Sequence, residues 1–318
     1  MTLARVLVTR RLPDGGLDPL TAAGHEMVLP PPDDTPLAPS ELAGVASTVD
    51  GIVCVLTDRI DADVLQAGAG RLRVVADVAV GYDNIDVTTA DALGIAVCNT
   101  PGVLDETTAD LAFFLILAAS RRTSDAEADL REGRWTGFRM DRFLGQDVHG
   151  RTLGVVGFGR IGQAVARRAA GFGMEVLHHA RHDTGMPGWI PDLDDLLRVA
   201  DVVTLHVPLT PHTTALVDAR RLALMKPSAV LVNTSRGPVV DEEALADALE
   251  RGAIFGAGLD VYEREPQVHP RLLSAPHTVL LPHIGSASEG TRRRMAQLAC
   301  EGVVAVLAGE RPPNLVTR

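Results

Sequence analysis

A cation, two carboxylic acids and an imidazole follow short apolar runs in the second half of the chain. They are Arg236 after the run 229–233, Asp260 and Glu265 after 256–259, and His283 after 278–281. An arginine can bind a carboxylate through two parallel hydrogen bonds, and an imidazole can act as a general acid. Each residue also has a structural interpretation, because an acid before proline is often a turn former. Their convergence after successive strands favours a catalytic site.

Three glycines with the spacing G-x-G-x-x-G lie near the middle of the chain, at Gly157, Gly159 and Gly162. The strand-like run 152–156 precedes them and a helix-like run 163–170 follows, which is the context of a dinucleotide-binding turn. The first glycine permits the turn, the second lets backbone approach a pyrophosphate, and the third lets helix pack on strand. The helix N-terminus offers unpaired N–H groups to phosphates. Further contacts are expected from Phe158, Arg160 and Ile161.

The cofactor is predicted to be NADP(H) in preference to NAD(H). An NAD enzyme of this kind normally has Asp or Glu about 20 residues past the glycines, on the ribose 2′-hydroxyl. This chain has Ala180, Arg181 and His182 there, and an arginine can pair with a 2′-phosphate. Two alternatives stay open: Arg181 stacks on the adenine of NAD, or a slip of one or two residues brings Asp183 to the ribose.

The elements that position these residues alternate in the way that predicts a doubly wound parallel sheet. The predicted strands are 152–156, 174–178, 202–205, 229–233, 256–259 and 278–281, and the predicted helices are 161–171, 192–198, 218–224 and 241–250. Ligands bind beyond the carboxyl ends of such strands. A last helix is expected over 286–308, with Ser286 and Glu289 as its capping box.

The first hundred residues predict a second sheet of buried parallel strands. These strands are 5–8, 51–55, 72–76 and 96–98, each apolar on both faces as parallel sheets require. The segment 30–39 holds five prolines and is expected to be a loop. A buried helix is expected over 110–120, capped by Thr107, Thr108 or Asp110. The segment 133–150 reads as irregular.

Composition excludes several classes of protein. A chain of 318 residues favours two domains. The net charge of -11 argues against nucleic-acid binding, and the longest apolar run, 111–119, is too short to cross a membrane. The three cysteines stand far apart with no metal spacing, so we expect reduced core thiols in a cytoplasmic protein and no metal site.

The sequence resembles the D-isomer-specific 2-hydroxyacid dehydrogenases, and especially their glyoxylate/hydroxypyruvate reductase branch. The resemblance spans nearly the whole chain in the right order. The segments that carry it are 54–61, 80–86, 133–136, 155–162, 233–237, 258–266 and 282–286.

That resemblance implies two α/β domains, flavodoxin-like and Rossmann, with the active site in a cleft between them. The substrate domain would comprise 1–99 and 285–318, and the dinucleotide-binding domain 100–284. Arg236, Glu265 and His283 would be the catalytic residues. Arg236 would bind the substrate carboxylate and carbonyl oxygen, and His283 would give that oxygen a proton. Glu265 would hold the imidazole's tautomer and favour its protonated form.

Further contacts follow from the strand ends and the resemblance together. Besides the glycine loop and Arg181, the expected cofactor residues are Thr108, His206, Val207, Pro208, Thr213, Thr234, Ser235, Asp260 and Gly285. The backbone N–H groups of Val80 and Gly81 would receive the substrate carboxylate, and Leu56 would form an apolar wall. Gly81 could also be an ordinary turn glycine.

A homodimer is implied as well, with Trp135 in the contact segment. An aromatic residue from this segment reaches the partner's site in the branch, and this chain has Phe138 there.

The predicted activity is NAD(P)H-dependent reduction of a small 2-oxo acid, glyoxylate or hydroxypyruvate first, to the D-2-hydroxy acid. Formate, phosphonate, D-lactate and phosphoglycerate dehydrogenases share the scaffold and remain alternatives. A different class is a dinucleotide-sensing protein like the family's transcriptional co-repressors, which keep the same catalytic residues.

Overall fold

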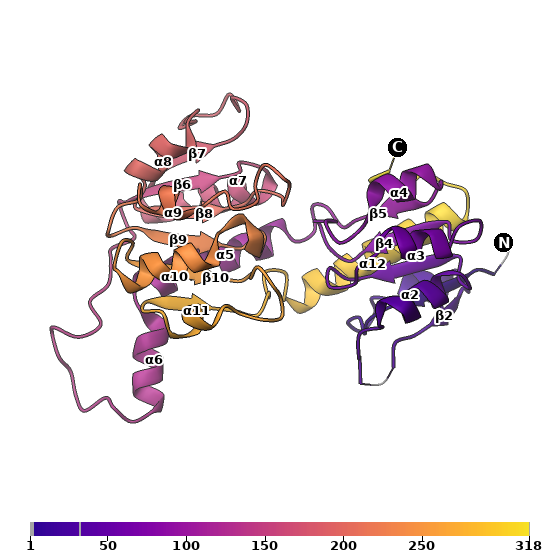
Figure 1. Ribbon diagram of the computed structural model, residues 1–318, viewed down its shortest axis with the longest axis horizontal. Coiled ribbons are helices and arrows are strands. Elements are labelled where there is room, and N and C mark those ends of the chain that lie inside the picture. The colour runs from indigo at the N-terminus through magenta and orange to yellow at the C-terminus, as the bar shows by residue number, and fades with distance from the viewer. Residues whose placement is uncertain (1–2, 32, 318) are drawn as a thin grey trace. The chain divides into compact units, whose positions relative to one another are not determined.

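A computed structural model describes residues 3–31 and 33–317 of the protein (Figure 1). The chain divides into two compact units, of which one comprises Met1–Leu104 with Ser286–Arg318 and the other Asp105–Gly285. Each unit holds a sheet whose paired strands are all parallel. Since helices cover both faces of each sheet, the predicted class of two doubly wound parallel sheets is confirmed.

The sheet of the first unit has the order β2-β1-β3-β4-β5, which is the flavodoxin-like order. Its strands are β1 Arg5–Val8, β2 Glu26–Val28, β3 Gly51–Cys54, β4 Val74–Asp77 and β5 Ala96–Cys98. Strand β2 was not among the predicted strands, because this edge strand has only three residues and none of them is buried. Without a buried face it has no apolar pattern to detect.

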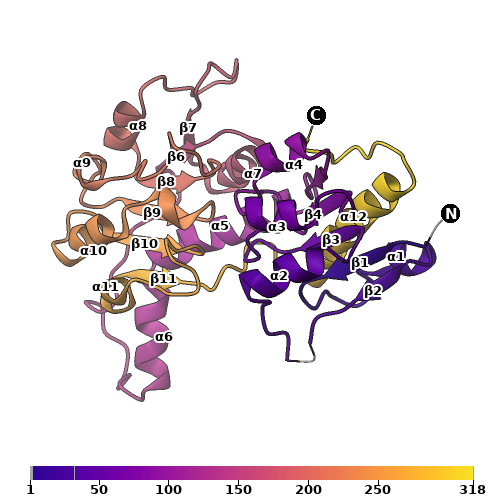
Figure 2. The same ribbon diagram turned by 45° about the vertical axis from the view of Figure 1, so that its right-hand side comes forward.

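Two sets of helices cover this sheet (Figure 2). Helices α2 Pro39–Ala46, α3 Ala62–Ala67 and α4 Val87–Ala92 pack on one face, and α1 Asp18–Ala22 and α12 Glu289–Leu307 pack on the other. The predicted cap of the last helix was wrong by two residues: Ser288 accepts the N–H of Thr291 at 3.3 Å. The predicted loop 30–39 ends where α2 begins at Pro39, and Pro32 lies outside the described residues.

The sheet of the second unit has the order β11-β10-β9-β8-β6-β7. Its strands are β6 Thr152–Val156, β7 Glu175–His179, β8 Val202–Leu205, β9 Val230–Asn233, β10 Gly256–Leu259 and β11 Thr278–Leu280. Beyond β7, Trp189 forms a single parallel bridge with His178. That bridge stands where the third strand of a Rossmann sheet lies, so the switch in strand order falls between β6 and β8.

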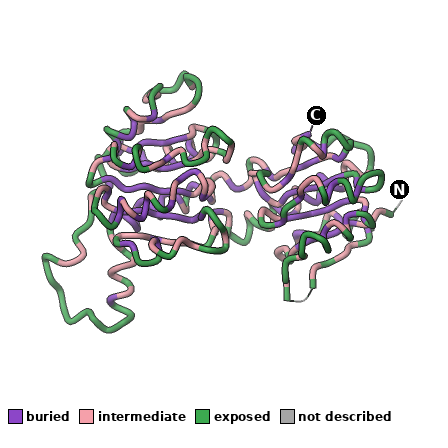
Figure 3. The backbone as a smooth tube through the Cα atoms, in the orientation of Figure 1, coloured by how far each residue is buried: buried purple, intermediate pink, exposed green. Residues whose placement is uncertain are grey.

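Helices again cover both faces of this second sheet, and Figure 3 shows the buried strands between them. Helices α5 Asp105–Ser120 and α7 Arg160–Ala169 pack on one face. Helices α8 Leu193–Val199, α9 Ala219–Leu222, α10 Glu242–Glu250 and α11 Pro270–Ser274 pack on the other. The predicted start of α5 was wrong, because the helix begins at Asp105 and the proposed caps at 107, 108 and 110 lie inside it.

An exposed segment follows α6 Thr123–Arg131 (Figures 1 and 3). Residues 132–147 form no helix or strand, as predicted for 133–150. Two residues of this segment form ion pairs with Asp129, a buried residue of α6: Arg134 at 2.7 Å, and Arg142. Within the described ranges, no helix is both long and apolar enough to cross a membrane.

Candidate active site

The glycine loop joins β6 to α7 in the geometry that a dinucleotide requires. Gly157 has a φ of +91°, which L side chains rarely adopt, and a Cβ there would overlap the backbone of His206. A Cβ at Gly162 would overlap the carbonyl oxygen of Gly157. At Gly159, by contrast, the space where a Cβ would point is open. The first and third glycines therefore serve close packing, and the second leaves its backbone open to a ligand.

The surroundings of this loop fit a nicotinamide dinucleotide. Helix α7 starts after Gly159, so its first N–H groups face the open side of the loop. The hydroxyl of Thr234, at the end of β9, is buried and has no hydrogen-bond partner among the described residues. Buried polar atoms without partners are uncommon and mark sites where a ligand or water completes the bonding. A phosphate-bearing ligand with further polar groups would satisfy both features.

The loop after β7 carries Arg181. The guanidinium of Arg181 is exposed and makes no ion pair with any described residue. Asp183 is also exposed, and its carboxylate accepts the N–H of Gly185 at 2.8 Å within its own turn. Behind the loop, the ring of His178 stacks on Phe158 with centroids 3.7 Å apart, and its Nε2 lies 2.7 Å from the Thr184 hydroxyl. The guanidinium of Arg181 thus has no ion-pair partner among the described residues, whereas the Asp183 carboxylate already accepts a backbone hydrogen bond.

The loop after β8 closes the opposite side of the switch point. His206 lies 2.9 Å from the hydroxyl of Thr204, and burial lowers the pKa of His206 to about 3. Val207 and Pro208 follow it. The hydroxyl of Thr213 donates to the Pro208 carbonyl at 2.7 Å and accepts the N–H of Thr210 at 2.8 Å. The ring of His206 is therefore neutral, and Thr213 holds the shape of its loop.

Glu265 and His283 form a hydrogen-bonded pair. Nδ1 of His283 lies 2.8 Å from Oε2 of Glu265, and both side chains are about three-quarters buried, with exposed fractions of 25% and 23%. Burial raises the pKa of Glu265. The hydrogen bond and charge of His283, the N–H of Tyr262 and the charge of Arg236 outweigh this and lower it overall. The carboxylate thus stays charged and holds the Nδ1 proton, which leaves Nε2 of the imidazole for another partner.

The backbone around Arg236 is fixed by Asn233, the last residue of β9. Its Nδ2 donates to the Arg236 carbonyl at 2.9 Å, and its Oδ1 accepts the N–H and hydroxyl of Ser235 at 3.0 and 2.8 Å. One terminal nitrogen of Arg236 also donates to the Ser235 carbonyl at 2.9 Å. The guanidinium is therefore held at the carboxyl edge of the sheet, near enough to Glu265 to affect its charge.

Asp260 ties the end of β10 to the turn that carries His283. Its two carboxylate oxygens accept the N–H groups of Ile284 and Gly285, each at 2.7 Å, and the residue is 1% exposed. A Cβ on Gly285 would lie 3.5 Å from the side chain of Thr108, so these residues form one corner. Burial raises the pKa of Asp260 to about 6, although the two N–H groups and the charge of His283 oppose the rise.

The raised pKa of Asp260 predicts a pH-dependent stability. A carboxyl whose pKa rises on folding, from 3.8 to about 6, stabilises the fold fully below about pH 4 and loses this contribution as pH rises through about 6. The free energy of unfolding of the cofactor-free protein, relative to Asp260→Asn, should fall by about 2–3 kcal/mol between acid and neutral pH. Urea unfolding of both proteins measures this difference. A difference that does not vary with pH would contradict the assignment.

The residues expected to bind substrate in the first unit follow β3 and β4. The side-chain amide of Asn99 donates to the Val80 carbonyl at 2.8 Å, and Thr100 N–H donates to Ala79 at 2.8 Å. The N–H groups of Val80 and Gly81 have no acceptor among the described residues. This loop is therefore fixed through its carbonyls and leaves two donors free.

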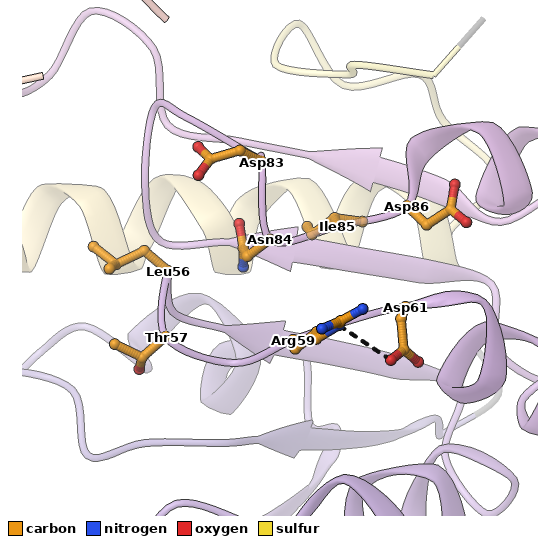
Figure 4. A pocket seen from close by; sticks show the side chains of 8 residues that line it. All are labelled: Leu56, Thr57, Arg59, Asp61, Asp83, Asn84, Ile85 and Asp86. Carbon is orange, nitrogen blue, oxygen red and sulfur yellow. Dashed lines mark ion pairs between the residues drawn. The ribbon is translucent and has the colours of Figure 1, made fainter. Parts of the chain in front are cut away.

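Leu56 lies at one end of a pocket of about 480 Å³ in the same unit (Figure 4). The pocket lies between the chain segments that follow β3 and β4, and its lining residues are Leu56, Thr57, Arg59, Asp61, Asp83, Asn84, Ile85 and Asp86. Asp61 and Asp86 cap α3 and α4, and Arg59 pairs with Asp61 at 3.3 Å. Asn84 donates to the carbonyls of Val55 and Asp58 at 3.3 and 3.0 Å. These contacts hold the Leu56 loop.

Two residues that organise the site were missed in the sequence analysis. The side-chain amide of Asn233 donates to the Arg236 carbonyl, and the backbone N–H of Tyr262 donates to the Glu265 carboxylate. The signal for Asn233 was a polar residue at the end of an apolar strand. Tyr262 gave no signal, since an aromatic residue after a strand is an ordinary core residue.

Comparison with known proteins places these observations in a family. The model of the NAD-binding domain of D-isomer specific 2-hydroxyacid dehydrogenases matches residues 113–285. The glyoxylate reductase of Thermococcus onnurineus is 46% identical over 99% of this chain and 96% of its own length. That of Korarchaeum cryptofilum is 48% identical over 99% and 96%.

Solved structures agree with these matches. A Thermus thermophilus protein has a TM-score of 0.92 at 46% identity, covering 98% of this chain and all of its own. The NADPH-dependent glyoxylate/hydroxypyruvate reductase of Sinorhizobium meliloti, solved with NADP and malonate, has a TM-score of 0.88 at 36% identity, covering 99% and 97%.

Proposed function

Because the chain belongs to the D-isomer specific 2-hydroxyacid dehydrogenase family and is an oxidoreductase, we propose that it reduces a small 2-oxo acid to the D-2-hydroxy acid with NADPH. Glyoxylate and hydroxypyruvate are the first candidate substrates. The observation that carries the proposal is the His283–Glu265 hydrogen bond of 2.8 Å, with the charge of Arg236 acting on the same carboxylate. An acid and an anion-binding cation are the two groups that reduction of a 2-oxo acid requires.

Each of the three side chains has a distinct role in this proposal. Arg236 binds the substrate carboxylate and polarises the carbonyl oxygen, where negative charge develops during reduction. His283 donates the proton on Nε2 to that oxygen, and Glu265 accepts the hydrogen bond from Nδ1 and stabilises the imidazolium. No metal takes part, because polarisation and protonation are both assigned to side chains.

When bound, the cofactor would supply the hydride for the carbonyl carbon. The glycine loop and the N-terminus of α7 would hold its pyrophosphate. The polar groups at the other strand ends, His206 to Pro208, Thr213, Thr234 and Ser235, would hold the rest of the dinucleotide, and the corner of Thr108, Asp260 and Gly285 would hold its nicotinamide end. The free N–H groups of Val80 and Gly81 bind the substrate carboxylate. Leu56 limits the size of the group that the substrate carries on its carbonyl carbon.

A preference for NADPH is part of the proposal, and Arg181 is its determinant. Charge-assisted hydrogen bonds to a phosphate contribute about 1.5–3 kcal/mol. Arg181→Ala should therefore lower kcat/KM for NADPH by about 10- to 100-fold and leave kcat/KM for NADH unchanged. Arg198→Ala, which removes an exposed arginine paired with Asp195, is the matched control. A wild-type preference for NADH would contradict the assignment.

We also propose a homodimer formed through the exposed segment after α6. Large apolar side chains are exposed on α5, α6 and this segment: Phe114, Leu130, Trp135, Phe138, Met140 and Leu144. Phe114 also lines a pocket of about 570 Å³ between α5 and α6. Large exposed apolar side chains that gather in one part of a chain favour a protein–protein contact there. Sedimentation equilibrium should give a dimer, and Leu130→Asp with Phe138→Asp should give a folded monomer; a monomeric wild type would contradict the proposal.

We propose that the enzyme is cytoplasmic. Cys54, Cys98 and Cys300 are free and buried, which supports a reducing, cytoplasmic location. The net charge of -11 is unfavourable for binding nucleic acid. We therefore propose small 2-oxo and 2-hydroxy acids as its ligands besides the cofactor.

The proposal is tested by NADPH oxidation with glyoxylate, hydroxypyruvate and pyruvate in parallel. We expect turnover with glyoxylate and hydroxypyruvate, and the comparison with pyruvate measures what the hydroxyl of hydroxypyruvate contributes to kcat/KM. Turnover with none of the three would overturn the proposal and favour a dinucleotide-sensing protein without catalytic activity.

A further inference from the structure

Tyr262 contacts all three segments that carry Arg236, Glu265 and His283. It lies two residues after Asp260, and it is only 6% exposed. Its backbone N–H donates to Oε1 of Glu265 at 3.0 Å, and its hydroxyl donates to the Leu281 carbonyl at 2.9 Å. Its own carbonyl packs against Gly237, where a Cβ would overlap it. No other residue described above makes all three contacts.

The contact with Glu265 fixes the carboxylate at both oxygens. Oε1 is held by Tyr262 N–H and Oε2 by the imidazole of His283. A carboxylate held at one oxygen alone can rotate about its last side-chain torsion, which has broad minima. The second bond therefore sets the direction in which Oε2 faces the ring.

The contact with Leu281 fixes the backbone that leads to His283. His283 has a φ of +54°, a left-handed conformation that few residues other than glycine adopt. Such a conformation persists only where surrounding contacts impose it. Leu281 N–H donates to the Leu259 carbonyl at 2.8 Å, and the Leu281 carbonyl accepts the Tyr262 hydroxyl. Leu281, two positions before His283, is thus held by hydrogen bonds through both its N–H and its carbonyl.

The hydroxyl of Tyr262 is a permanent donor in this arrangement. Burial raises the pKa of Tyr262 above its ordinary value, and the neighbouring charges of Asp260, Glu242 and Glu265 raise it further. The phenol therefore keeps its proton over the working pH range. A phenylalanine would fill the same volume but would leave the Leu281 carbonyl without this donor, so packing alone does not explain a tyrosine here.

We infer that Tyr262 is a positioning residue that holds Glu265 and His283 in register for proton donation, an inference that rests on the proposed function. It acts through Glu265 by its N–H and through Leu281 by its hydroxyl, and it touches no reacting atom. The charged groups around His283 within its own unit are Glu265, Asp260 and, beyond Glu265, Arg236. A change in the relative positions of Glu265 and His283 should therefore alter both the proton affinity of His283 and the rate at which it donates a proton.

The test is Tyr262→Phe, with Ser120→Ala as the control. Ser120 is buried and its hydroxyl has no partner among the described residues, so the control removes a buried hydroxyl without losing a hydrogen bond. For Tyr262→Phe we expect kcat roughly threefold to tenfold lower, as for the loss of one hydrogen bond. The KM for NADPH should be unchanged, and the alkaline limb of the pH–kcat profile should move to lower pH. Ser120→Ala should match the wild type in all three.

Two results separate this inference from the proposed function. Wild-type kcat and pH profile in a folded Tyr262→Phe protein, or a loss of kcat without any shift of the alkaline limb, would overturn the positioning role. Near-normal turnover in His283→Ala would instead overturn the proposed function.

The position of the His283 ring can also be followed without catalysis, by ring-proton NMR. The signal of His283 is assigned by its loss in His283→Ala. We expect this signal to shift in folded Tyr262→Phe, and an unchanged signal would contradict the inference.

Discussion

His283→Ala should lower kcat for 2-oxo acid reduction by about 10²–10⁴-fold, the range typical for loss of a general acid. Without the imidazole, the developing charge on the carbonyl oxygen has no proton donor in reach. The affinity for NADPH should be unchanged, because His283 is held by Glu265 and, among the described residues, has no hydrogen bond to the glycine loop. Steady-state kinetics and a fluorescence titration with NADPH measure the two quantities.

The controls for this variant lie in the same chain. His149→Ala removes an exposed histidine outside the site, and its kcat should equal that of the wild type. Glu265→Gln keeps the shape of the partner but removes its charge, so kcat should fall and the alkaline limb should move to lower pH. Near-normal turnover in His283→Ala, with the protein folded, would contradict the role of His283 as the acid.

Arg236→Lys should lower kcat/KM by about 10²–10⁴-fold, since it removes up to two charge-assisted hydrogen bonds of about 1.5–3 kcal/mol each. A lysine keeps the positive charge but cannot present two parallel donors to a carboxylate and a carbonyl oxygen. The backbone at Arg236 is fixed by Asn233, so the shorter ammonium cannot follow the substrate. Both KM and kcat should change, because the interaction strengthens as charge develops.

The matched control is Arg251→Lys on the exposed end of α10, which pairs with Asp247 at 3.5 Å. It changes the same residue type at a surface ion pair, where little free energy is at stake. Its kcat/KM should be that of the wild type. Equal kcat/KM in Arg236→Lys and the wild type would show that bidentate binding is not required and would remove Arg236 from the proposed mechanism.

The centre of the second unit's sheet could be predicted from the sequence because its strands are buried on both faces. Runs such as Val202–Leu205 and Val230–Asn233 are buried at every position, and continuous apolar runs are what parallel strands require. The same reasoning failed for β2, whose three residues are all partly exposed. It also failed at Trp189, where the third strand is reduced to one bridge, so no strand pattern exists there.

Helix ends were predicted less well, for a physical reason. Several polar residues near a helix start can cap it, and only the fold selects one. Ser286 and Ser288 are chemically equivalent, yet Ser288 is the residue in the extended conformation before α12. For α5, a polar first turn from Asp105 to Thr108 hid the helical start, because its acids favour the helix N-terminus without forming an apolar face.

The candidate site shows what strand ends can and cannot reveal. Asp260 and His283 were selected as polar residues after apolar strands, and the structure brings them to one corner through Ile284 and Gly285. The pairing of Glu265 with His283, 18 positions apart, was expected from the family resemblance alone, and the structure places the two side chains 2.8 Å apart. Tyr262 could not be found at all, because its part depends on its backbone N–H as much as on its side chain.

The proposed reduction of a 2-oxo acid to the D-2-hydroxy acid by hydride transfer is tested by following the transferred hydrogen and by determining the configuration of the product. Hydroxypyruvate is incubated with the protein and with NADPH that carries deuterium at the transferred position of the nicotinamide ring. We expect D-glycerate with deuterium at C2, formed by the wild type and, at a greatly reduced rate, by His283→Ala. L-glycerate, or glycerate without deuterium at C2, would contradict it.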